Sequence, residues 1–125
     1  MDEKEQEERV RKVLDKVQKE YGFIPLVSEI MSKRPDLYLP YSELSSILFF
    51  KPKHMDQRTT ELAAIAASAA LGSDHCLNVH IPQAMKVGVT EEEVLEAMLV
   101  GAMMGFNRSN SISLRCFKAA TEAKE

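Results

Sequence analysis

The spacing of hydrophobic residues predicts helices along the whole chain. Over residues 1–21, apolar side chains recur at helical intervals and form one narrow stripe made by Val10, Val13, Leu14, Val17 and Tyr21. This N-terminal helix is expected to end at Gly22, and the first nine residues, which lack the stripe, are expected to fray. Alternating patterns typical of strands are absent, so the predicted fold class is all-α, with about six to seven helices in a single domain over residues 1–125.

Helix-capping and helix-breaking residues divide the rest of the chain. The predicted helices are one from Pro25 to about Ser32, one from Asp36 to Phe50, one from the cap at Asp56 to Gly72, one from the cap at Ser73 to Val87, one from a Thr90–Glu93 capping box to near Phe106, and a last one from Ser109 to Ala123.

Two of these helices have an unusual composition. The helix over residues 56–71 carries Ala on all faces and is predicted to be buried centrally. The helix that follows Thr90 contains Gly101 and Gly105, which destabilise a helix unless close packing compensates. Such apolar helices in a small protein indicate that the core continues into a neighbouring subunit of a homo-oligomer.

Charge and length exclude several classes of function. The net charge of −3 offers no broad basic field for nucleic acid. No apolar run approaches the roughly 20 residues that a membrane span needs, and the charged start of the chain does not resemble a signal peptide. Two cysteines far apart in the sequence favour a reducing cytoplasm over a disulfide scaffold.

The segment GSDHCLNVH, residues 72–80, concentrates reactive side chains. With Ser73 as the N-cap, Cys76 occupies the third helical position, where free backbone N–H groups and the helix dipole favour a thiolate. His75 is its sequence neighbour, and His80 lies four residues further on, on the same helix face as Cys76. Cysteine and histidine in this spacing can exchange a proton directly or through water.

Glu61 is the third candidate in this group. If the two helices fold back at Gly72 as an antiparallel pair, equal rise per residue places position 61 opposite position 83, within one turn of His80. A carboxylate beside an imidazole orients it and supports its basicity, so Glu61, His80 and Cys76 could form a proton relay. Pro82 would lie inside the second helix, where it is expected to bend it.

The spacing of these residues resembles the relay of the alkylhydroperoxidase D-like and carboxymuconolactone decarboxylase family, whose pattern is E, eleven residues, then C-x-H-C-x-x-x-H. Here the stretch reads ELAAIAASAALGSDHCLNVH, and the following IPQAMKVGVTEEEVLEAM is similar to the family's next helices. The likeness is good over the motif-bearing core at residues 56–107, looser over 22–55, and absent from the first twenty residues. It implies an alkylhydroperoxidase D-like helical fold and assembly into trimers or hexamers. We expect no cofactor and no metal.

The resemblance also implies roles for individual residues. Cys76 matches the cysteine that reacts with peroxide, His80 the histidine that takes its proton, Glu61 the carboxylate behind that histidine, and His75 the histidine between the two cysteines of the family. Ser73 stands where the first cysteine would be. Oxidised Cys76 therefore cannot close the short disulfide, which leaves sulfenic acid, an external thiol or over-oxidation as its fates.

Three functions follow from this pattern as alternatives. The first is thiol-dependent peroxide reduction by a single cysteine. The second is a decarboxylase or lyase acting on a small carboxylated lactone, with His80 as acid and base. The third is a non-catalytic oligomeric domain that kept the fold after losing the cysteine pair.

Simpler interpretations of the same residues stay open. Cys76 could be a small buried apolar side chain, His80 a hydrogen-bonded core histidine and His75 an ordinary helix-start residue. A metal site made by these three with Glu61 is disfavoured, because His75 and His80 are five residues apart and face different ways. Cys116 is expected to serve packing rather than to resolve an oxidised Cys76.

Overall fold

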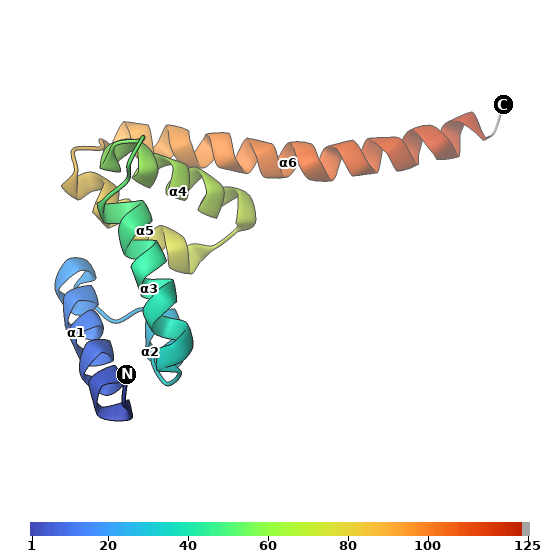
Figure 1. Cartoon of the computed structure of the whole chain (residues 1–125). Helices are drawn as coiled ribbons and strands as arrows, with labels where there is room; N and C mark the ends of the chain where they lie inside the picture. The colour runs from blue at the N-terminus through green and yellow to red at the C-terminus, as the bar shows by residue number, and fades with distance from the viewer. Residues whose placement is uncertain (124–125) are drawn as a thin grey trace. The chain divides into compact units, whose positions relative to one another are not determined.

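The computed structural model describes residues 1–123, and within this range all regular structure is helical (Figure 1). This confirms the predicted all-α class, with six helices. Their bounds are α1 Glu3–Tyr21, α2 Leu26–Met31, α3 Pro35–Phe50, α4 Gln57–Leu71, α5 Asp74–Lys86 and α6 Glu91–Glu122. None of these helices is both long enough and apolar enough to cross a membrane.

The chain divides into two compact units, Met1–Gln57 and Arg58–Glu125. In the first unit, α1 and α2 pack against α3. The rings of Tyr21 and Phe50 lie 6.3 Å apart between centroids, and the Gln57 amide donates to the Phe50 carbonyl at 3.0 Å. Candidate chemistry lies in the second unit, and the single-domain assignment over residues 1–125 stays a prediction.

The N-terminal helix is more regular than its apolar stripe suggested. It begins at Glu3, because the Asp2 side chain caps it by accepting from the Glu5 backbone N–H at 2.8 Å. Residues 3–9, which the missing apolar stripe had predicted to fray, are therefore helical in the structure. Gly22 ends the helix in the left-handed conformation, with φ of 81°, as predicted.

The second unit is built on a hairpin of α4 and α5, to which the start of α6 is added. Ile65 of α4 and Ala84 of α5 are fully buried, and Val89 and Val94 complete the buried cluster. Between α4 and α5, Gly72 has φ of 69°, which reverses the chain without the steric cost that other residues would meet.

Helix α4 buries only one face within this chain. Its buried residues are Thr60, Glu61, Ile65 and Ser68. Ala63, Ala67 and Ala70 are exposed on another side, so the prediction that this helix is buried centrally was wrong for the single chain. Alanine has high helix propensity, which is sufficient to explain its presence on an exposed face.

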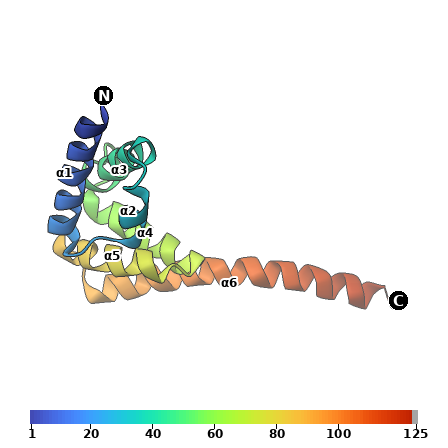
Figure 2. The same cartoon turned by 90° about the horizontal axis from the view of Figure 1, so that it is seen from below.

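Helix α6 is one continuous helix rather than two. Thr90 and Glu93 form the predicted capping box, with the Thr90 hydroxyl accepting from the Glu93 N–H at 3.2 Å and the Glu93 carboxylate accepting from the Thr90 N–H at 2.9 Å. The predicted end near Phe106 and the separate helix from Ser109 were wrong. No Gly or Pro follows Gly105 in the sequence. The polar residues after Phe106 therefore weaken the helix without ending it. Beyond α4 and α5 it continues alone within this unit (Figures 1 and 2).

The two glycines of α6 allow it to approach α4, as their position predicted. A Cβ on Gly101 would lie 2.7 Å from the backbone carbonyl carbon of Ala66, and a Cβ on Gly105 would lie 3.2 Å from the backbone oxygen of Ala70. These contacts set the level at which α6 crosses α4.

We expect the stability contributed by Glu93 to depend on pH. The Arg58 guanidinium, and then the Thr90 N–H, hold the pKa of this exposed carboxyl below its ordinary value of 4.5. A lowered folded-state pKa adds stability above the unfolded-state pKa, and that stability disappears as the pH falls through the folded value. Glu93→Gln should therefore lower the free energy of unfolding more at pH 7 than at pH 3, as measured by urea unfolding. An equal loss at both values would contradict this assignment.

Candidate active site

The centre of the candidate site is a buried pair made by Glu61 of α4 and His80 of α5. The His80 Nδ1 lies 2.8 Å from the Glu61 Oε2. Only 4% of the Glu61 side chain and 13% of the His80 side chain are exposed. A buried carboxylate without a partner would be costly, so this hydrogen bond explains how Glu61 is tolerated in the core.

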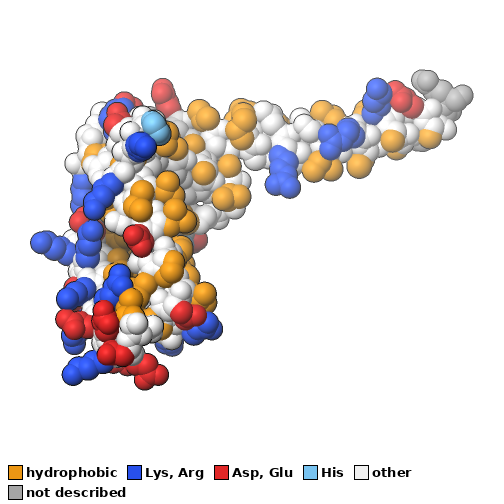
Figure 3. All heavy atoms as spheres, in the orientation of Figure 1, with side chains coloured by type: hydrophobic (Ala, Val, Ile, Leu, Met, Phe, Trp, Pro, Cys, Tyr) orange, Lys and Arg blue, Asp and Glu red, His pale blue; other side chains and the backbone are white. Residues whose placement is uncertain are grey.

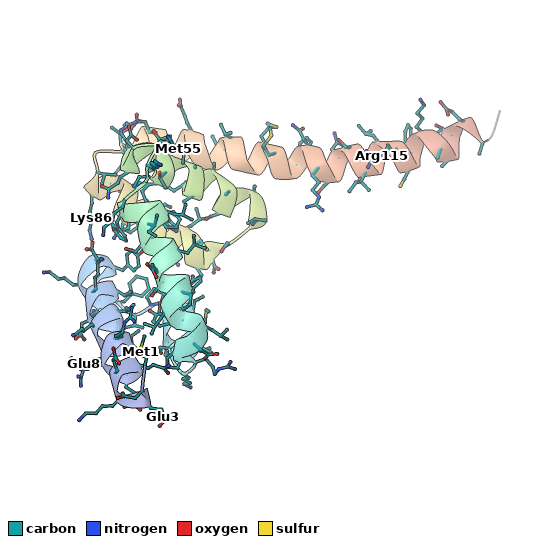
Figure 4. All side chains as sticks on the ribbon, in the orientation of Figure 1. Met1, Glu3, Glu8, Met55, Lys86 and Arg115 are labelled. Carbon is teal, nitrogen blue, oxygen red and sulfur yellow. The ribbon has the colours of Figure 1, made fainter. Side chains whose placement is uncertain are left out.

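Local sequence explains why these two side chains meet. Gly72 reverses the chain and Ser73 caps α5, so the two helices leave the turn as a hairpin. Equal rise per residue then brings the level of Glu61 close to that of His80, as predicted. Pro82 lies inside α5 without ending it, since the helix continues to Lys86, which Figure 4 labels.

Cys76 lies in the first turn of α5, one turn before His80. Its backbone N–H donates to the Ser73 hydroxyl at 3.4 Å, which confirms Ser73 as the N-cap. The residue is half-buried, and its thiol is free of any disulfide. Cys76 lies four residues before His80, which places it on the helix face that carries the His80 side chain.

The hydrogen bond to Glu61 determines which nitrogen of His80 can react. When the carboxylate accepts from Nδ1–H, the lone pair is on Nε2. This nitrogen is the one that can take a proton from a nearby thiol or substrate. The arrangement of carboxylate, imidazole and half-buried thiol is the one used to activate a nucleophile.

His75 occupies the opening turn of α5 and is half-buried. Its backbone N–H donates to the Asp74 carboxylate at 2.8 Å. It lies next to Cys76 in the chain but on a neighbouring face of the helix, away from the one that holds His80. Within residues 1–123, no three His, Cys, Asp or Glu side chains are grouped so that they could hold a metal ion.

The second cysteine lies away from this group. Cys116 is exposed on α6, eleven residues after Gly105, the glycine that faces Ala70 near the end of α4. At the rise of an α-helix this separation is about 16 Å along the axis, far more than a disulfide spans. In this structure Cys116 serves neither packing nor resolution of Cys76 within the chain, so the expectation that it packs was wrong for the single chain.

Sequence reasoning missed one buried polar residue on the same helix. Gln83 is only 7% exposed and lies three residues after His80, so it continues the face that Cys76 and His80 share. The sequence indicated this position, because Gln83 is a polar residue at helical spacing from both Cys76 and His80. Thr60, adjacent to Glu61, is also buried, at 6% exposure.

Comparisons with known proteins agree with this architecture. Neither the curated proteins nor the solved structures gave a significant match. The family model described as the carboxymuconolactone decarboxylase family matches residues 35–118. That range is two thirds of the chain and includes α3, α4, α5 and most of α6. The chain therefore belongs to the carboxymuconolactone decarboxylase family.

Proposed function

We propose that the protein is an enzyme that reduces peroxides with a single cysteine, Cys76, and an external thiol. The observation that carries this proposal is the buried Glu61–His80 hydrogen bond, one helical turn from a half-buried thiol at a helix N-terminus. Membership of the carboxymuconolactone decarboxylase family supports the proposal, because the family that the sequence resembles includes alkylhydroperoxidase-like enzymes. The two separated cysteines support a place in the reducing cytoplasm.

The first half of the reaction uses the pair as a base and then as an acid. His80 Nε2 takes the proton of the Cys76 thiol, and Glu61 stabilises the resulting imidazolium. The thiolate attacks the terminal hydroxyl oxygen of ROOH, so an S–O bond forms and the O–O bond breaks. Cys76 is oxidised to sulfenic acid, and the alkoxide leaves as ROH with the proton returned by His80. His75, in the same turn as Cys76 but on a neighbouring face of the helix, is assigned only an assisting role.

The second half needs two equivalents of an external thiol. The first attacks the sulfenic acid, forms a mixed disulfide with Cys76 and releases water. The second attacks that disulfide, restores the Cys76 thiol and leaves as the oxidised reductant. Ser73 cannot take the place of the first thiol, because a hydroxyl does not form a disulfide.

A second candidate function does not use the thiol. The same Glu61–His80 pair is a buried acid–base couple, which a lyase or decarboxylase acting on a small carboxylated lactone also needs. Such an enzyme should retain its activity in a Cys76→Ser variant and lose it in a His80→Ala variant. A non-catalytic oligomeric domain would show neither activity.

The Ser73→Cys substitution tests the proposed cycle. We expect the wild-type protein to convert tert-butyl hydroperoxide to the alcohol with dithiothreitol as reductant. Ser73→Cys should add a resolving thiol three residues before Cys76, and oxidation should then give an intramolecular disulfide instead of a mixed one. Alcohol formation and intact mass measure the two effects. If neither the wild-type protein nor Ser73→Cys formed the alcohol, the proposal would be contradicted.

A further inference from the structure

Exposed apolar surface does not single out a further site in this chain. Figure 3 shows hydrophobic side chains over both units, and the exposed ones include residues of α2, α3 and α6. The polar groups around Cys76 are more specific, because a reaction at its sulfur needs donors and acceptors at fixed positions.

Two serine hydroxyls lie in the hairpin of α4 and α5, and they differ in what their hydrogens do. Ser68 is buried, and its hydroxyl donates to the Ala64 carbonyl at 2.6 Å. Ser73 is half-buried, and its hydroxyl accepts from the Cys76 backbone N–H at 3.4 Å. Among residues 1–123, the structure shows no acceptor for the Ser73 hydroxyl hydrogen. That hydrogen can therefore be donated to a substrate.

The backbone holds Ser73 in place from both sides. Its N–H donates to the Ser68 carbonyl at 2.9 Å, and its carbonyl accepts from the Leu77 N–H at 3.1 Å. The first bond, with Gly72 in the left-handed conformation, is the Schellman ending of α4, and the second opens α5. The Ser73 hydroxyl is therefore fixed at the start of the helix that carries Cys76.

The proposed reaction leaves one peroxide oxygen without a partner. His80 returns its proton to the leaving oxygen, whereas the attacked hydroxyl oxygen receives no hydrogen bond from the Glu61–His80 pair. A serine hydroxyl can accept one hydrogen bond and donate another at the same time. The bond that Ser73 accepts from the Cys76 N–H polarises its hydroxyl and makes it a better donor. Ser68 cannot take this role, because its hydrogen is bound to Ala64.

We infer that the Ser73 hydroxyl donates to the peroxide oxygen that Cys76 attacks, and so holds the O–O bond in line with the sulfur. This inference rests on the proposed function. No covalent bond to Ser73 forms or breaks, and its hydrogen stays on Oγ. The attacked oxygen keeps the same hydrogen bond when it becomes the oxygen of the sulfenic acid. Ser73 is then a catalytic residue of the single-cysteine reaction rather than the remnant of a missing cysteine.

Two rates measured on the full chain at pH 7 test this role, in a Cys116→Ser background so that only Cys76 reacts. One is oxidation by hydrogen peroxide, followed by intact mass, and the other is alkylation by iodoacetamide, which presents no peroxide oxygen. Ser73→Gly removes the hydroxyl at little cost to the cap. It should lower the oxidation rate about tenfold, the loss of one hydrogen bond in the transition state, and the alkylation rate by less than about twofold. Ser73→Thr, which keeps a hydroxyl, should restore the oxidation rate.

The other serine of the hairpin gives the matched control. Ser68→Ala deletes a hydroxyl whose hydrogen is already bound, and it should leave the ratio of the two rates unchanged. If circular dichroism showed that Ser73→Gly loses helix, Ser73→Asp would replace it, because aspartate caps a helix and carries no hydroxyl hydrogen at pH 7. Its oxidation rate should fall more than its alkylation rate.

The same rates separate this inference from the proposed function. Equal losses of oxidation and alkylation in Ser73→Gly would show that Ser73 acts only as a cap. Fast oxidation of Cys76 that Ser73→Gly leaves unchanged would overturn the role of Ser73 alone. Oxidation of Cys76 no faster than that of free cysteine would overturn the peroxide-reducing function, and the role of Ser73 with it.

Discussion

Replacing Cys76 by Ser should lower peroxide turnover by about 100-fold or more, because the hydroxyl that replaces the thiol cannot be oxidised to a sulfenic acid. The fold should persist, since the bond that caps α5 runs from the backbone N–H of residue 76 to Ser73 and does not involve the thiol. Alcohol formation from tert-butyl hydroperoxide, followed with dithiothreitol in excess, measures the loss.

The chain contains its own control for this experiment. Cys116 is the more exposed of the two thiols, and it lies on the outer half of α6, far from the buried pair. Cys116→Ser should therefore leave turnover unchanged. If Cys76→Ser retained full turnover, or if Cys116→Ser abolished it, the assignment of Cys76 as the nucleophile would be wrong.

Gly101→Ala should cost about 3 kcal/mol in the free energy of unfolding. A Cβ at this position meets the backbone of Ala66, with the carbonyl carbon at 2.7 Å, and a backbone atom cannot rotate away as a side chain can. The higher helix propensity of alanine recovers only about 1 kcal/mol. Urea unfolding followed by circular dichroism, at equal chain concentration for both proteins, measures the difference.

Gly105→Ala is the matched control for this close approach. Its Cβ would lie 3.2 Å from the Ala70 oxygen, a contact that a small shift of the helices relieves. Because the gain in helix propensity opposes this smaller strain, the variant should stay within about 1 kcal/mol of wild type. Equal destabilisation by both substitutions would show that contact with α4 does not distinguish the two glycines.

The elements that sequence reasoning predicted well are those governed by local signals. Ser73 and Thr90 are N-caps, because their hydroxyls accept from backbone N–H groups of the helix that follows. Gly22 ends α1, because a residue without a side chain adopts the left-handed conformation at little cost. The contact between Glu61 and His80 followed from the same signals. Once the tight turn between the two helices is located, the constant rise per residue determines which residues of the two helices lie at the same level. Catalytic roles for these residues stay a proposal.

The elements that sequence reasoning placed wrongly are those whose extent or burial no local signal determines. The polar run after Phe106 resembles a break, but no residue in it prevents the helix, so α6 continues to Glu122. The alanines of α4 resemble a central core helix, but the single chain has no element to cover Ala63, Ala67 and Ala70 within the described residues of this unit. Hydrophobicity shows that a face can be buried and does not show by what.

Competitive oxidation of the two native thiols tests the central claim most directly. Wild-type protein is treated with less than one equivalent of hydrogen peroxide, and the sulfenic acid is trapped with dimedone and located by peptide mass spectrometry. We predict that the half-buried Cys76 is modified well before the exposed Cys116, and that His80→Ala removes this preference. Modification of Cys116 ahead of Cys76, or an identical pattern in His80→Ala, would contradict a peroxide-reducing site at Cys76.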